Sequence, residues 1–223
     1  MELIARGRDA DVYALDESRV LRRYRHGGGS TELEARLMGH LSSCGYPVPQ
    51  VHGAGGTDMV LERLTGPTML DVMARRPWQV RPLGRLLGGL HDRLHALPAP
   101  EWLPRRFSTA QDPEGDRVLH LDLHPANVML TPRGPMVIDW CNARAGDPGA
   151  DLAMTLVTIG SAEAPGAVAR LGRGLLLRAI RDGSRTDPGR WMQEAITAKL
   201  SDPNLKPAEA ARLRARAESA SAF

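Results

Sequence analysis

The chain of 223 residues has little of several residue types, and each shortage excludes a class of protein. Its two cysteines, Cys44 and Cys141, lie far apart in apolar sequence, so we expect free thiols in a reducing cytoplasm rather than a disulfide framework. Four Trp, three Tyr and two Phe leave few rings to stack on bases, and the net charge of +3 comes from scattered residues, so we expect no nucleic-acid binding. The longest apolar run, residues 153–162, is too short to span a bilayer, and residues 1–6 show no signal-peptide pattern, so we expect no membrane segment.

Lysine is also scarce, since none precedes Lys199, and the basic residues are mainly arginines. What remains is an ordinary globular composition, with 42% hydrophobic and 25% charged residues. A chain of this length can bury a real core, either as one domain or as two small lobes.

The most informative stretch is residues 120–127, with the sequence HLDLHPAN. Asp122 lies between two leucines, Asn127 follows five residues later, and Asp139 comes twelve residues after that. This spacing suits phosphoryl transfer, in which one group orients a hydroxyl and two oxygen ligands hold magnesium on a nucleotide. Asp122 would accept or align the hydroxyl proton, and the oxygens of Asn127 and Asp139 suit a hard cation.

The residues between Asn127 and Asp139 are typical of a hairpin. Apolar runs at 128–130 and 136–138 flank residues 131–135, whose Thr, Pro and Gly indicate a turn. We therefore expect the turn to bring Asn127 near Asp139.

Two other interpretations of the central stretch compete with this one. On a strand, His120, Asp122 and His124 would point to one side and could bind a metal ion, but that leaves Asn127 and Asp139 unexplained. Alternatively the two histidines only make hydrogen bonds within a loop, and we adopt this interpretation: they position the loop and bind no metal.

The chain resembles the aminoglycoside phosphotransferase and choline kinase group, which shares the protein-kinase fold, in residues 120–127, 138–140, 146–148 and 151–153. The resemblance implies an α+β, two-lobed, protein-kinase-like fold, with a small antiparallel-sheet N-terminal lobe and a mainly helical C-terminal lobe. It implies that Asp122 is the catalytic base and that Asn127 and Asp139 bind Mg²⁺. It also implies that Asp151 braces the catalytic loop. There is no Ala-Pro-Glu motif and no room for a long regulatory loop, which favours a small acceptor.

The N-terminal residues are expected to form a small antiparallel sheet from strands at 2–6, 11–15 and 19–24. By the resemblance, the turn at Gly7 covers the phosphates of the nucleotide, with Arg8 assisting. Taken alone, the same residues are an ordinary hairpin turn.

The third predicted strand carries Arg22 where related kinases carry the lysine that holds the α and β phosphates. A guanidinium can bind phosphate oxygens through two hydrogen bonds, so Arg22 can supply the charge. The alternative is that Arg22 is a solvated strand residue.

A helix is predicted to follow, with Leu33, Leu37, Met38 and Leu41 on its apolar side. By the resemblance, Glu34 is the partner of the strand cation. Thr31 and Glu34 also match a capping box at the helix start, and both interpretations stand.

Residues 59–64 predict a strand that runs into the hinge. By the resemblance, the backbone of Glu62 and Leu64 would hydrogen-bond the adenine. We expect the lobes to meet near Gly66, giving a nucleotide-binding lobe at 1–66 and a catalytic and substrate-binding lobe at 67–223.

The second lobe is expected to be helical, after a short strand at 117–119. His91 and His95 lie four residues apart on one predicted helix, where the surrounding leucines favour core packing over metal binding. The other helices are expected at 68–73, 80–97, 150–161, 164–181, 188–200 and 207–219.

We expect an ATP-dependent, less readily GTP-dependent, kinase that uses Mg²⁺ and phosphorylates a small hydroxylated molecule. After residue 162 the bases outnumber the acids, which favours a neutral or anionic acceptor over a polycationic aminoglycoside. The alternative is a pseudokinase or nucleotide-binding module of the same fold, suggested by the missing lysine and the sparse glycines.

Overall fold

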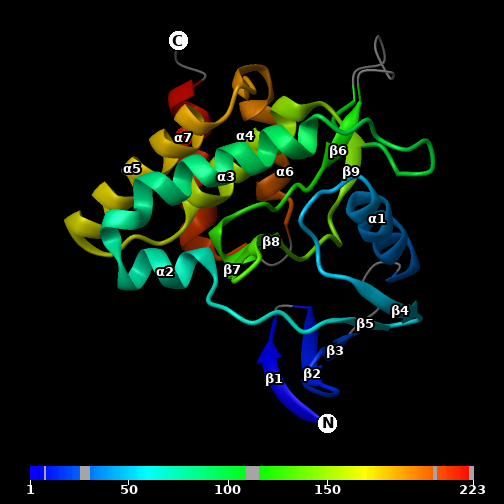
Figure 1. The fold of residues 1–223 in the computed structure, drawn as a ribbon. Coiled ribbons are helices and arrows are strands. Elements are labelled where there is room, and N and C mark those ends of the chain that lie inside the picture. Colours follow the sequence, from blue (N-terminus) through cyan, green and yellow to red (C-terminus); the bar gives the residue numbers. More distant parts are fainter. Residues whose placement is uncertain (8, 26–30, 109–115, 203–204, 221–223) are drawn as a thin grey trace. The chain divides into compact units, whose positions relative to one another are not determined.

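The computed structural model describes the chain except for residues 8, 26–30, 109–115, 203–204 and 221–223 (Figure 1). The described residues form two compact units. The N-terminal unit comprises Met1–Met69 and Ala126–Ala143, and the C-terminal unit comprises Leu70–Pro125 and Arg144–Phe223. The division into functional lobes at 1–66 and 67–223 stays a prediction.

A five-stranded antiparallel sheet is the frame of the N-terminal unit (Figure 1). Its strands are β1 (Glu2–Arg6), β2 (Ala10–Ala14), β3 (Arg19–Tyr24), β4 (Val51–Gly55) and β5 (Asp58–Glu62). They lie in the order β1-β2-β3-β5-β4. The three strands predicted from the first residues are confirmed, and β4 was missed because its sequence, VHGAG, lacks the alternation that marks a strand.

Helix α1 (Thr31–Ser43) contacts β4 and β5 of this sheet. Leu37, Met38 and Leu41 are buried along its inner side, as the apolar spacing predicted. Cys44, just after the helix, is exposed, so its expected apolar surroundings are wrong, although both cysteines are free thiols as expected.

The hairpin predicted after Asn127 is present in the N-terminal unit. Strands β7 (Val128–Thr131) and β8 (Gly134–Val137) pair antiparallel, with Val128 opposite Val137. This pairing places the residues that flank the hairpin on either side of its open end.

The C-terminal unit is mainly helical (Figure 1). Its helices are α2 (Met69–Arg75), which begins at the unit boundary, α3 (Val80–His95), α4 (Pro148–Ser161), α5 (Gly166–Gly183), α6 (Met192–Leu200) and α7 (Pro207–Ala220). Short 3₁₀ turns lie at Pro77–Gln79, Pro125–Asn127 and Gly189–Trp191, the second across the unit boundary. Strand β6 (Arg117–Leu119) pairs antiparallel with β9 (Arg144–Gly146), a three-residue strand too short to be recognised in the sequence.

Helix α4 is the buried centre of this unit, because most of its residues are apolar and nearly all are buried, the polar Asp151 and Thr155 included. Asp147 caps its start by accepting a hydrogen bond from the Gly149 amide at 2.8 Å, and Pro148 occupies the first turn. Leu121 belongs to the core cluster that α4 forms with α6 and α7. The loop that carries Asp122 is therefore anchored in the core.

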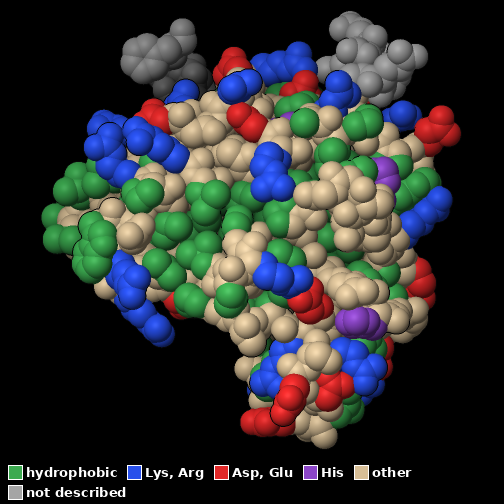
Figure 2. Space-filling model, viewed as in Figure 1, with side chains coloured by type: hydrophobic (Ala, Val, Ile, Leu, Met, Phe, Trp, Pro, Cys, Tyr) green, Lys and Arg blue, Asp and Glu red, His purple; other side chains and the backbone are tan. Residues whose placement is uncertain are grey.

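Surface chemistry adds two observations. On the face shown in Figure 2, apolar side chains gather over α3 and α5 of the C-terminal unit. Among the described residues, no helix has both the length and the apolar character needed to cross a membrane.

Helices α3 and α5 approach each other closely at Gly88. A Cβ atom at Gly88 would lie 2.4 Å from the carbonyl oxygen of Ile180, closer than any real contact, whereas one at Gly89 would meet nothing within 4 Å. Only the first glycine is required by packing.

We therefore predict opposite effects for two neighbouring substitutions. Gly88→Ala should lower the free energy of unfolding by about 2 kcal/mol, because α5 must move away. Gly89→Ala should raise it by about 0.5–1 kcal/mol, because alanine restricts the unfolded chain and favours the helix. Urea denaturation measures both, and equal stability of the two variants would contradict this account of the crossing.

Candidate functional site

A cavity of about 420 Å³ lies in the N-terminal unit and is lined wholly by residues of that unit. Its apolar lining includes Val20, Leu61, Met129 and Ile138. Six of the eight residues predicted for the site also line it: Gly7, Arg22, Glu62, Leu64, Asn127 and Asp139. The sheet and the β7–β8 hairpin thus bring together residues that are far apart in sequence.

Arg22 projects from β3 into this cavity and forms an ion pair with Glu34 of α1. The Tyr24 hydroxyl lies 3.0 Å from both Arg22 Nη2 and Glu34 Oε2. Burial acts to lower the pKa of Arg22, but the adjacent charge of Glu34 outweighs it and the pKa is raised. Arg22 is therefore a permanent cation in the wall of the cavity and not a solvated strand residue.

Glu34 uses both carboxylate oxygens within the unit. Oε2 binds Arg22 and Tyr24, and Oε1 accepts a hydrogen bond from the Trp140 amide at 3.0 Å. Thr31 donates its hydroxyl to the Gly56 carbonyl at 2.9 Å. Glu34 is therefore the ion-pair partner of the strand cation, Arg22. The alternative interpretation, that Thr31 and Glu34 form a capping box, is wrong.

Asn127 and Asp139 flank the hairpin and both line the cavity. The Asn127 carbonyl accepts a hydrogen bond from the Ile138 amide at 3.0 Å, which holds the two ends together. Asp139 has a left-handed backbone with φ of 67°, and its Oδ1 lies 3.8 Å from Arg22 Nη1 and accepts from the Cys141 thiol at 3.2 Å. The predicted proximity of Asn127 and Asp139 is confirmed, while their role as ligands stays a prediction.

The turn at Gly7 is a closed hairpin turn, since the Gly7 amide donates to the Ala10 carbonyl at 2.8 Å. The Gly7 carbonyl accepts from Arg25 Nη2 at 2.8 Å. This turn lines the cavity, but the Gly7 amide itself is already used. Arg8, predicted to assist, lies outside the described residues.

The predicted hinge begins where β5 ends. The Glu62 amide donates to the Gln50 carbonyl at 2.8 Å, and its carboxylate pairs with Arg133. Leu64 follows two residues later and lines the cavity together with Glu62.

Asp122 belongs to the C-terminal unit, on a loop rather than a strand. The Asp122 amide donates to His120 Nδ1 at 3.3 Å, and its Oδ2 lies 3.7 Å from His124 Nε2. The loop histidines thus position Asp122 as expected. Because residues 120–124 are not a strand, the alternation behind the alternative metal site is lost.

The charge state of Asp122 follows from its neighbours. Burial acts to raise the pKa of this carboxyl, but the His124 imidazole, with smaller effects of His120 and Lys199, outweighs burial and leaves the pKa below its ordinary value. Asp122 is therefore a carboxylate at neutral pH.

Asp151 of α4 binds the backbone of the same loop. Its Oδ1 accepts from the Leu121 amide at 2.6 Å and its Oδ2 from the His120 amide at 3.2 Å. Burial opposes ionisation of Asp151, but the adjacent imidazoles of His91 and His95 hold its pKa well below the ordinary value. The expectation that Asp151 braces this loop agrees with these bonds.

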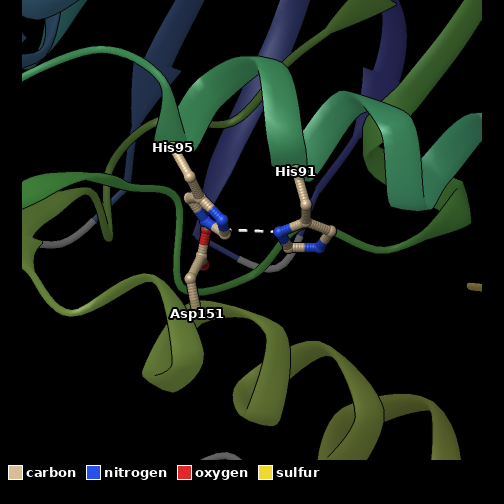
Figure 3. Close-up of side chains that lie close together, drawn as sticks. All are labelled: His91, His95 and Asp151. Carbon is tan, nitrogen blue, oxygen red and sulfur yellow. Dashed lines mark hydrogen bonds and ion pairs between the residues drawn. The ribbon is translucent and has the colours of Figure 1, made fainter. Parts of the chain in front are cut away.

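The contact of both histidines of α3 with Asp151 was missed (Figure 3). His91 and His95 are buried, as predicted, but they are hydrogen-bonded rather than packed among leucines only. Their four-residue spacing was the available signal. The sequence did not show which acid they face.

A comparison with known families identifies the relationship. The model of the phosphotransferase enzyme family matches residues 1–117 and 109–191. The chain belongs to this family. Its resemblance to the aminoglycoside phosphotransferase and choline kinase group is thereby confirmed, as is the prediction that it is a phosphotransferase enzyme.

The chain is also similar in sequence to an individual kinase. Streptomycin 6-kinase from Streptomyces griseus is 32% identical over an alignment that covers 45% of this chain and 42% of that protein. The matched part thus spans less than half the length of that relative.

Two solved structures show that the family fold extends over nearly the whole chain. Aminoglycoside phosphotransferase APH(4)-Ia, in a ternary complex with ADP and hygromycin B, matches with a TM-score of 0.64 and 16% identity, over 97% of this chain and 91% of that one. Choline kinase from Cryptosporidium parvum Iowa II matches with a TM-score of 0.58 and 10% identity, over 99% and 88%. The predicted protein-kinase-like α+β fold is confirmed.

The buried ion pair between Arg22 and Glu34 leads to a prediction about stability. Glu34→Leu should lower the free energy of unfolding by about 3–5 kcal/mol, because it removes the closer and more buried of the two carboxylates that pair with the Arg22 guanidinium. The double variant Arg22→Met/Glu34→Leu should lose less than the sum of the two single variants. Urea denaturation of the three variants measures the coupling.

The Arg23–Asp58 pair is the matched control, since it joins β3 to β5 with both side chains more than a third exposed. Removing either partner there should cost at most about 1 kcal/mol. Additive losses at Arg22 and Glu34, or equal losses at the two pairs, would contradict the prediction.

Proposed function

We propose that the chain transfers the γ-phosphoryl group of ATP to a hydroxyl of a small molecule. The observation that carries the proposal is the cavity of the N-terminal unit, which is lined by Arg22, Asn127 and Asp139, with Arg22 ion-paired to Glu34. A cation for phosphate and two oxygen ligands for a metal are what a nucleotide triphosphate requires.

The cavity suits ATP in shape and chemistry. Its apolar lining, including Val20 and Leu61, can enclose a flat base, and Glu62 and Leu64, whose backbone would hydrogen-bond the adenine, line it as well. Arg22 takes the place of the usual lysine and binds the α and β phosphates, and Gly7 gives the covering turn its shape. GTP remains the less favoured nucleotide.

Asn127 and Asp139 fit Mg²⁺ by donor chemistry, since hard cations take carboxylate and amide oxygens. Asp139 is 44% exposed in its side chain, and its Oδ2 accepts no hydrogen bond from any described residue. Bound magnesium would neutralise charge on the phosphates. Asn127 contributes an oxygen without adding a second negative charge.

Asp122 is the catalytic base of the proposal. As a carboxylate at neutral pH it can accept a hydrogen bond from the acceptor hydroxyl and align its oxygen with the phosphorus. A low pKa makes Asp122 a weak base, which suits a transition state in which the hydroxyl proton leaves late. His120 and His124 keep the carboxylate in place.

The acceptor is proposed to be a small hydroxylated compound, neutral or anionic, because bases outnumber acids after residue 162. The likeness to streptomycin 6-kinase makes streptomycin the first compound to test against that proposal. A cytoplasmic location and the absence of nucleic-acid and membrane partners remain predictions.

A second candidate is a nucleotide-binding module without transferase activity. The observation in its favour is the Gly7 amide, which is closed in a hairpin turn and cannot bind phosphate as it stands. Binding alone does not require the alignment of a catalytic base, so ATP binding without turnover would favour this candidate.

The roles of the two acids can be separated by one pair of substitutions. Asp122→Asn should reduce kcat by at least about 100-fold and leave ATP binding unchanged, because its carboxylate acts on the acceptor. Asp139→Asn should abolish the magnesium-dependent part of the thermal stabilisation by ATP, because the metal loses a charged ligand. Thermal-shift titrations with and without Mg²⁺ and a coupled ADP assay measure both.

Asp182→Asn, an exposed position on α5, is the control and should change neither quantity. If Asp122→Asn retained turnover, Asp122 would not be the catalytic base. If Asp139→Asn retained the magnesium-dependent stabilisation, Asp139 would not be a magnesium ligand.

The acceptor prediction is tested with a panel at equal concentration. Streptomycin, hygromycin B, choline and neutral and anionic sugars are incubated with ATP and Mg²⁺, and transfer of phosphate is followed by mass spectrometry. We expect transfer to neutral or anionic compounds to exceed transfer to the cationic ones, because the surplus of bases repels cations. Preference for streptomycin would overturn that prediction, and no transfer to any compound would favour the binding module.

A further inference from the structure

Two histidines of α3 point toward Asp151 (Figure 3), whose carboxylate accepts hydrogen bonds from the backbone of the Asp122 loop. His91 and His95 are one helical turn apart, with 0% and 8% of their surface exposed. Neither is used in the proposed reaction. Buried imidazoles need hydrogen-bond partners, so the partners show what the pair does.

His95 acts through Asp151. Its Nε2 lies 2.9 Å from Asp151 Oδ2, and because a carboxylate only accepts hydrogen bonds, Nε2 carries the proton. Nδ1 is then free to accept from the Thr186 hydroxyl at 3.3 Å. Burial, the largest effect, lowers the pKa of His95, which agrees with this neutral form. His95 thus fixes the carboxylate that holds the Leu121 amide.

His91 acts mainly through Thr155. Its Nε2 lies 3.1 Å from Thr155 Oγ1, and the Thr155 hydroxyl donates to the Leu123 carbonyl at 2.8 Å. Since that hydroxyl proton is already used, His91 Nε2 must be the donor. Nδ1 of His91 is buried, has no hydrogen bond from the described residues, and approaches Asp151 Oδ2 at 3.4 Å.

The two chains of hydrogen bonds end on either side of Asp122. One holds the amide of Leu121 and the other holds the carbonyl of Leu123. Leu121 has a left-handed backbone with φ of 62°, a conformation that persists in a leucine only where its surroundings enforce it. The loop therefore depends on being held at both ends.

We propose that His91 and His95 are positioning residues, which set the place of the Asp122 carboxylate through Thr155 and Asp151. The proposal rests on the proposed function in giving Asp122 the catalytic role. What it adds is that α3, by way of two imidazoles, determines how well Asp122 is aligned. A displacement of about 1 Å at such a group can cost about 100-fold in rate.

His91, His95 and Asp151 could also be metal ligands, because their donor atoms lie within 4.8 Å of one another. Hydrogen bonds already account for both ring nitrogens of His95 and for Nε2 of His91. The hydrogen-bonded brace uses more of the observed contacts, so it is preferred. Metal content is measured as an outcome that would overturn it.

The test compares His91→Leu, which removes both nitrogens, with His91→Gln, whose amide can still donate to Thr155. Hydrogen–deuterium exchange of residues 118–125, followed by mass spectrometry, is the first measurement. We expect exchange there to become at least about ten-fold faster in His91→Leu and to stay within about three-fold of wild type in His91→Gln, because only the first releases the loop. Leu87→Ala, a buried apolar position on the same helix, controls for general destabilisation of α3.

Thr155→Val keeps the volume of the side chain and removes the hydroxyl. It should reproduce His91→Leu, and the double variant should be no worse than either single variant, because both break the same chain of bonds. This arm keeps the proposal testable if His91→Leu does not fold.

Kinetics supply the second measurement, with ATP and whichever acceptor of the panel is phosphorylated. His91→Leu and Thr155→Val should lower kcat at least about ten-fold with KM for ATP unchanged, and His91→Gln should restore most of kcat. If the wild-type protein phosphorylates nothing, the proposed function fails, while hydrogen exchange still decides the positioning role.

Three results would overturn the proposal. One is unchanged exchange at residues 118–125 in both His91→Leu and Thr155→Val. Another is an equal acceleration in Leu87→Ala. The third is a stoichiometric metal ion in the purified protein, measured by elemental analysis, that is lost in His91→Leu and His95→Leu.

Discussion

A buried carboxylate that accepts a backbone amide is the interaction on which the geometry of this protein depends. Asp151, wholly buried in the C-terminal unit, binds the amide of Leu121, the residue just before Asp122. Glu34, buried in the N-terminal unit, binds the amide of Trp140, the residue just after Asp139. Each of the two key acids is therefore next to an amide that another acid holds.

The same two places carry backbone strain. Leu121 and Asp139 are two of the three non-glycine residues with positive φ among the described residues. Such a conformation costs about 1–2 kcal/mol, so it needs compensation from tight surroundings. The buried carboxylates supply that compensation, because leaving them without these donors would cost more than the strain.

Each buried acid in turn needs partners that stabilise its charge. Glu34 has Arg22, a permanent cation, and Asp151 has two imidazoles. The two kinds of partner differ in their surroundings. Arg22 also lines the cavity, where we propose that it binds phosphate, whereas His91 and His95 are buried. Under the proposed function, Arg22 therefore contributes both to stability and to nucleotide binding.

Much of this could be predicted from the sequence where the signal was local. The strands before residue 24, the hairpin after Asn127 and the helix with Leu37 and Leu41 follow from alternation, turn residues and helical spacing. Strand β4 was not predicted because Gly53 and Gly55 interrupt the alternation of apolar and polar residues. Strand β9 was not predicted because three residues are too few to show that alternation. Cys44 was placed in apolar surroundings by its neighbours in sequence, but it lies past the end of α1, where the chain is exposed.

By itself the sequence determined the fold class, the hairpin that joins Asn127 to Asp139 and the spacing of the three residues assigned to the reaction. Only the tertiary structure decided that Glu34 pairs with Arg22 instead of capping its helix, and that His91 and His95 face Asp151. Spacing along the chain sets local structure, because neighbouring residues share backbone geometry. The partner of a buried charge is chosen by packing between elements distant in sequence, and no local pattern records that choice.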